Sequence, residues 1–198
     1  MDAWLGGLIG GAGGAVIGHF ANHAISWVKE TVQSNPERKF ICVELIFKLE
    51  EFARKCEEVA RDYGQPQGEQ GEYEAEVKCP DIFDYSLIKG NWKALKPDLI
   101  YRICSLPVMH REAHHQLSWA GDNAFAPDYS EYFEARSYEY ALLGLEAATL
   151  ATDLRRQSKF PEGNLDDWII PSMIKQRDCV VAERKKREAR FNAPPEIG

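Results

Sequence analysis

Glycine recurs at every fourth position near the start of the chain, and no other feature of the sequence constrains the fold as strongly. Residues four apart are neighbours on a helix, so missing side chains let a second backbone approach closely. Small residues at this spacing drive helix association where hydrophobicity cannot, and we therefore predict a glycine-zipper helix. Its predicted association face comprises Gly6, Gly10, Gly14 and Gly18, with Gly7 and Gly11 in a second row alongside.

The segment that carries these glycines is uncharged from Trp4 to Val28, a length that is enough to cross a hydrocarbon core of roughly 30 Å. Seven glycines and several polar residues dilute its aliphatic content, so an isolated helix has only marginal hydropathy for a span. We predict that residues 1–30 form a membrane-inserted helix that is stabilised by association. Polar groups inside a membrane are costly unless they pair across helices or line a water-filled path. The polar residues of the predicted membrane helix are His19, Asn22, His23 and Ser26.

The residues that flank this segment predict its orientation. Asp2 precedes it, whereas Lys29, Arg38 and Lys39 follow it, so the positive-inside rule places the rest of the chain in the cytoplasm. The five cysteines agree, because they form no CxxC pair and suit a reducing compartment. No Lys or Arg precedes the apolar run, which disfavours a cleaved secretory signal. We expect a single-pass membrane protein whose C-terminal domain is cytoplasmic.

The remainder of the chain has the composition of a folded domain. Of the 198 residues, 44% are hydrophobic and 28% are charged, which is far from the signature of disorder. The net charge of -7 argues against nucleic acid as a partner, because phosphate neutralisation needs an excess of cations. We predict an all-α fold, in which a small helical bundle of about four helices follows the membrane segment. Its predicted parts are a first helix in 31–63, an acidic loop and bundle cap in 64–96, the remaining helices in 97–191 and a disordered tail in 192–198.

Capping residues and apolar spacing predict the first two helices of the bundle. Asn35 followed by Pro36 is typical of a helix start, and Gly64 is typical of a C-terminal cap. A second helix from Pro97 to about Gly121 should be kinked or broken at Pro107. The stripe of the first helix that we predict to be buried comprises Ile41, Leu45, Leu49, Phe52, Cys56, Val59 and Tyr63.

Two further helices are predicted downstream. The third carries aromatic and aliphatic residues at helical spacing, and we expect it to be the central helix of the core. Asp128 and Glu131 stand at the spacing of a capping box before it. The last helix should open after Asn164 and bend at Pro171. Its predicted apolar residues are Trp168, Ile170, Ile174, Val180 and Val181.

Two histidines give the sequence its main candidate for chemistry. His110 and His114 are four residues apart, which places both imidazoles on one helix face as zinc ligands sometimes require. The motif reads HREAHH rather than HExxH, and a third ligand would have to come from elsewhere in the fold, so hydrogen-bonded or exposed histidines are the commoner interpretation. Because no nucleotide-binding glycine pattern and no nucleophile beside a base is present, we predict no cofactor and disfavour an enzyme.

The last predicted helix ends in a basic run, which is the remaining predicted interaction surface. A cationic cluster at a helix C-terminus suits the helix dipole and can also contact anionic lipid or a partner. We therefore predict a membrane-anchored helical interaction protein that self-assembles or binds a membrane partner through its glycine face. The alternatives are an oligomeric membrane-perturbing or pore-forming effector and a metal-dependent enzyme that uses His110 and His114. The basic residues are Arg184, Lys185, Lys186, Arg187 and Arg190.

Overall fold

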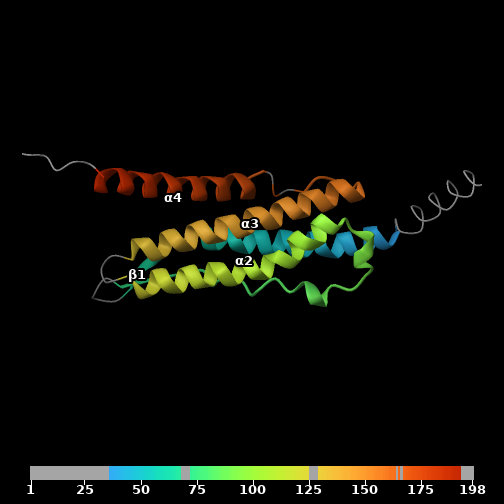
Figure 1. Ribbon diagram of the computed structural model, residues 1–198, viewed down its shortest axis with the longest axis horizontal. Coiled ribbons are helices and arrows are strands. Elements are labelled where there is room, and N and C mark those ends of the chain that lie inside the picture. Colours follow the sequence, from blue (N-terminus) through green and yellow to red (C-terminus); the bar gives the residue numbers. More distant parts are fainter. Residues whose placement is uncertain (1–35, 68–71, 125–128, 164, 166, 193–198) are drawn as a thin grey trace, which may run out of the picture.

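The computed structural model describes residues 36–67, 72–124, 129–163, 165 and 167–192. Four α-helices make up most of this part of the chain: a first helix over 36–60, α2 (Pro97–Asp122), α3 (Ser130–Ser158) and α4 (Ile169–Phe191) (Figure 1). The expectation of a mainly helical bundle is therefore confirmed for these residues. The predicted glycine zipper and membrane span, together with the tail at 193–198, lie outside the described residues. Within the described part, no helix is long and apolar enough for a membrane crossing.

The helix α3 lies between α2 and α4 and runs antiparallel to the first helix (Figure 1). Two ion pairs fix that direction, because Arg155 near the end of α3 binds Glu50 while Arg136 near its start binds Asp62. Buried residues occur on several sides of α3, as a helix surrounded by its neighbours requires. The prediction that the third helix is the core of the bundle is confirmed, and its largest fully buried side chains are Arg136, Tyr140, Leu143, Leu150 and Leu154.

The start of α3 differs from the sequence-based expectation. Its N-cap is Tyr129, which forms no side-chain capping hydrogen bond, and the helix begins at Ser130. Glu131 is therefore the second helical residue rather than the third, so it does not occupy the capping-box position. Its negative charge in the first turn still suits the helix dipole. The other half of the predicted box, Asp128, lies outside the described residues.

A short hairpin follows the first helix, where the sequence predicts an acidic loop. Strand β1 (Gln65–Gln67) pairs antiparallel with β2 (Glu72–Glu74), and Pro66 stands opposite Tyr73. Gly64 joins the helix to this hairpin with a φ of 73°, a conformation that glycine adopts without strain. Each strand has only three residues, too few for an alternating pattern to stand out.

The segment after the hairpin covers one side of the core, as the sequence predicts. Two 3₁₀ helices, η1 (Tyr85–Leu87) and η2 (Trp92–Ala94), are each capped by a side chain, Asp84 in the first case and Asn91 in the second. Both side chains accept a hydrogen bond from a backbone amide two residues further on, which satisfies a helix end. The segment anchors itself in the core through Phe83, Ile88 and Leu95.

The two prolines predicted to distort helices have milder effects. Pro107 lies inside α2, which continues to Asp122 without a break, so of the two predicted effects the break does not occur. Burial of Leu106 and His110 on either side of the proline favours the continuous helix. Pro171 falls in the first turn of α4, where its missing N–H is not needed.

The buried face of α4 also differs from the expectation. Ile169, Met173 and Val180 are buried together with the polar Gln176. Trp168 precedes the helix and is half exposed, and Ile174 lies at the surface. The apolar row at Ile170 and Ile174 has the same spacing of four as the row at Ile169 and Met173. Spacing alone could not distinguish these two rows.

Candidate functional site

The two histidines predicted as metal candidates lie together on α2 and share one partner. Their imidazole rings are stacked, with centroids 4.8 Å apart and planes inclined by 17°. The Tyr140 hydroxyl of α3 lies 3.3 Å from Nε2 of His110 and 3.2 Å from Nε2 of His114. Because both Nε2 atoms face the same phenol, the arrangement is a hydrogen-bonded cluster that joins α2 to α3.

Burial determines the protonation of two members of this cluster, His110 and Tyr140. Burial, together with the smaller effect of the neighbouring His114, lowers the pKa of His110 to about 4. Burial also raises the pKa of Tyr140 well above its usual range, with Cys79 adding to the effect. At neutral pH, His110 is a neutral imidazole and Tyr140 a neutral phenol. For His110 and Tyr140, hydrogen bonding without charge is therefore the role that this geometry supports.

Metal binding needs more donors than the two histidines supply. Within the described ranges, no group of three or more His, Cys, Asp or Glu side chains is placed to hold a metal ion. His110 is fully buried, and its Nδ1 atom has no hydrogen-bond partner in the structure. The metal-dependent alternative thus gains no third ligand from the residues around the histidines.

A second polar cluster lies beside the first and contains a buried arginine. Nη2 of Arg136 on α3 is 3.0 Å from Oδ2 of Asp62, while Nη1 donates to Sγ of Cys79 over 3.1 Å. Asp62 also accepts hydrogen bonds of 2.9 Å from the backbone amides of Gly64 and Val77. This network ties the end of the first helix and the hairpin to α3, which is a structural role.

The predicted basic patch at the end of α4 is partly occupied by contacts within the bundle. Arg187 forms a two-pronged ion pair with Glu134 of α3. Arg184 stacks its guanidinium over the Tyr138 ring, 4.6 Å from the centroid. Lys186 pairs with Glu183 at 2.7 Å, whereas Lys185 and Arg190 are exposed. Two of the five cations thus fasten α4 to α3, which reduces the charge available to a lipid surface.

An exposed apolar stripe on the first helix is a feature that the sequence analysis missed. We call it the Phe40 stripe, and it consists of Phe40, Val43 and Phe47, whose exposed fractions are 68%, 40% and 64%. At about 100° per residue, these three side chains lie roughly opposite the buried face of the same helix. Their spacing of three and four residues was the signal that could have revealed the stripe.

The structure thus describes two of the predicted sites and leaves the others untested. The histidine pair and the basic patch lie in the described bundle, whereas the glycine face and the polar residues from His19 to Ser26 lie outside the described residues. The described residues define a helical bundle with an aromatic stripe on its first helix. Comparison with protein-family models, with curated proteins and with solved structures found no match to this chain.

Proposed function

We propose that the chain is a membrane-anchored helical interaction protein. Residues 1–30 insert into the membrane, the bundle remains on the cytoplasmic side, and the glycine face assembles with itself or with a membrane protein partner. The observation that best supports this proposal is the Phe40 stripe. It begins ten residues after the glycine-rich segment and faces away from the core of the bundle.

The chemistry of the stripe suits a surface close to lipid headgroups. Its two phenylalanines are large apolar groups, and the cations Arg38 and Lys39 precede them on the same helix. Aromatic side chains beside cations are typical of helices that contact an anionic membrane surface. Further along the helix, the exposed positions are charged, with Glu51, Lys55 and Glu58 in that part. The apolar character is therefore concentrated at the end of the helix nearest the glycine segment.

Membrane fractionation tests the anchor. The intact chain should remain in the membrane fraction after carbonate extraction and should be released by detergent, whereas carbonate should release a chain lacking residues 1–30. An anchored helix resists carbonate because its apolar surface is buried in lipid. Recovery of the intact chain in the soluble fraction would contradict the proposal.

A pair of glycine substitutions tests assembly in the same preparation. Gly10→Ile with Gly14→Ile should reduce the oligomer in mild detergent at least tenfold, because two branched side chains block close backbone approach. The matched control is Ala12→Ile with Val16→Phe, which adds bulk on the other side of an ideal helix and should leave assembly intact. Sedimentation velocity would measure both variants. An unchanged oligomer in the glycine variant would exclude assembly through this face.

A further inference from the structure

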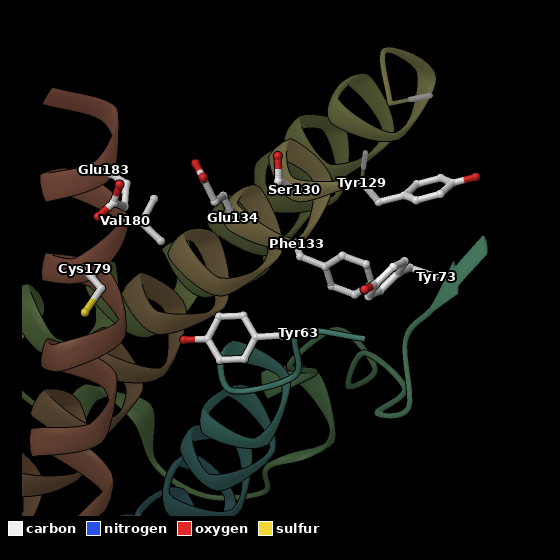
Figure 2. Close-up of a pocket in the computed structure, with 9 residues that line it drawn as sticks. All are labelled: Tyr63, Tyr73, Tyr129, Ser130, Phe133, Glu134, Cys179, Val180 and Glu183. Carbon is white, nitrogen blue, oxygen red and sulfur yellow. The ribbon is translucent and has the colours of Figure 1, made fainter. Parts of the chain in front are cut away.

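A cavity lies at the end of the bundle opposite the Phe40 stripe. Its volume is about 460 Å³, which is within the usual range for small-molecule sites. Figure 2 shows the aromatic rings of Tyr73, Tyr129 and Phe133 on one side of this space, Val180 of α4 on the other side and the Tyr63 ring between them. The rings come from three different parts of the chain: the turn after the first helix, the strand β2 and the start of α3.

The aromatic rings of the cavity are held in place by contacts among themselves and with the backbone. The Tyr73 ring lies 6.4 Å from that of Phe133 and 6.5 Å from that of Tyr129 between centroids. Gly64 packs so closely that a Cβ atom there would come within 2.2 Å of Cζ of Phe133. The Tyr63 hydroxyl donates to Oε1 of Gln176 on α4. The aromatic wall is therefore preformed, which lowers the cost of ligand binding.

The charged groups that line this cavity are both carboxylates, Glu134 and Glu183. No lysine or arginine is among the described residues that line it. Arg187 and Lys186 pair with these carboxylates but do not line the space. A ligand inside would therefore contact aromatic faces and negative oxygens, and this combination favours a cation over an anion.

We propose that this cavity binds a small organic cation, namely an alkylated ammonium group that carries an apolar body. The ring faces of tyrosine and phenylalanine attract such a group through their quadrupoles, and an alkylated ammonium loses little hydration on entering. Glu183 adds most of the electrostatic complement, because the charge of Glu134 is largely matched by its two-pronged pair with Arg187. The volume exceeds what an ammonium head needs, so the apolar body packs against Phe133 and Val180.

The cation is assigned to a free small molecule rather than to a lipid headgroup. The first helix covers residues 36–60 and, like any α-helix, rises about 1.5 Å per residue. One end of it follows the glycine segment, and the other end lies beside the cavity. That rise amounts to about 35 Å, which keeps the cavity away from a membrane at the other end. The cavity itself does not depend on the proposed anchor, because all of its lining residues lie in the bundle, whereas the choice of a free molecule over a headgroup rests on that proposal.

Calorimetric titration of the full chain tests the proposal. The chain is held in lipid nanodiscs without choline headgroups, and the probe is benzyltrimethylammonium, with benzyl alcohol as the neutral analogue and benzenesulfonate as the anionic one. The cation should bind at least tenfold more tightly than either analogue. Equal binding of the neutral analogue, or no binding of the cation, would overturn the proposal.

Variants locate the bound cation. Tyr129→Leu should weaken binding of the cation about tenfold, because it removes one aromatic face, and Glu183→Gln should weaken it about threefold. Tyr101→Leu is the matched control, since that tyrosine is exposed on α2 and does not line the cavity. Circular dichroism should confirm that each variant is folded. Glu183 is exposed, so Glu183→Gln should fold normally and can still test the site if Tyr129→Leu is destabilised. Unchanged affinity in Glu183→Gln and in a folded Tyr129→Leu would place the cation elsewhere and refute the site.

The lipid source is tested by repeating the titration in nanodiscs of phosphatidylcholine. An unchanged affinity for benzyltrimethylammonium supports a free molecule as the ligand, because the choline headgroups do not compete. A loss of apparent affinity of tenfold or more would overturn that assignment, since it would mean that headgroups reach the cavity.

Discussion

Burial of a single imidazole makes the stability of the bundle depend on pH. The pKa of His110 is lowered to about 4, mainly by burial and also by His114, whereas a histidine in the unfolded chain titrates near 6.5. Between these values the unfolded state binds more protons than the folded state, so folding is favoured less as the pH falls. We expect the free energy of unfolding to decrease by about 2 to 3 kcal/mol between pH 7 and pH 4 through this group.

A substitution assigns this loss to the buried residue. His110→Gln should remove most of the dependence between pH 7 and pH 4.5, because glutamine does not titrate, although it lowers stability at pH 7. Urea denaturation followed by far-UV circular dichroism would measure both variants. His115→Gln is the control, since His115 is exposed on the same helix and should leave the slope unchanged. A His110→Gln variant with the wild-type slope would show that other groups cause the pH dependence.

Among the elements, α3 is in close contact with both α4 and the first helix at Gly144. A Cβ atom there would lie 2.3 Å from Sδ of Met173 on α4 and 2.9 Å from Cβ of Cys56 on the first helix. Gly144→Ala should therefore destabilise the bundle by about 1 to 3 kcal/mol through overpacking, although alanine is the better helix former. Urea denaturation at pH 7 would measure the change.

A second glycine in a helix supplies the control for this prediction. At Gly121 in α2, an added Cβ would meet Tyr132 at 3.5 Å, which is an ordinary contact. Gly121→Ala should thus be neutral or stabilising by up to about 1 kcal/mol. Equal effects of the two substitutions would mean that helix propensity outweighs packing at the crossing of the three helices.

The contact of the three helices at Gly144 also explains why the sequence predicted the buried face of one helix and not that of another. The first helix has many apolar residues at one spacing, so its buried stripe was correctly predicted from Ile41 to Val59. The prediction was wrong for the last member, Tyr63, which lies beyond the end of the helix and is 58% exposed. On α4, two apolar rows have the same spacing, and the absence of a side chain at Gly144 leaves room for Met173. That information belongs to another helix, so local spacing could not supply it. Nor could it predict the pairing of Pro66 with Tyr73 in the hairpin.

The candidate sites follow the same division. The one-face placement of His110 and His114 was predictable from their spacing, whereas their shared partner Tyr140 comes from another helix. The cavity beside Phe133 was not predictable, because its lining residues come from the turn after the first helix, β2, α3 and α4. A site formed within one helix can be predicted from the sequence, whereas a site formed between elements can be identified only once the fold is known.

At the scale of the whole molecule, the bundle has two different ends. The Phe40 stripe lies on the first helix near residue 36, and the aromatic cavity lies near residue 63 at the other end. If the first end contacts lipid, the stripe should confer membrane affinity on the bundle without residues 1–30. We expect this shortened chain to bind vesicles that contain anionic lipid. The double substitution Phe40→Glu with Phe47→Glu should reduce its partition coefficient into these vesicles at least tenfold, because two apolar side chains that would be transferred from water into lipid are lost.

The control for this prediction carries the same change of charge on a different helix. Tyr101→Glu with Val108→Glu alters two exposed apolar residues of α2 and should preserve most of the binding. Since all four side chains are exposed, the free energy of unfolding should change by no more than about 0.5 kcal/mol per substitution in either variant. Vesicle co-sedimentation would compare them. Equal losses of binding would indicate that net charge, rather than the Phe40 stripe, governs membrane contact, and the stripe would then be available to a protein partner.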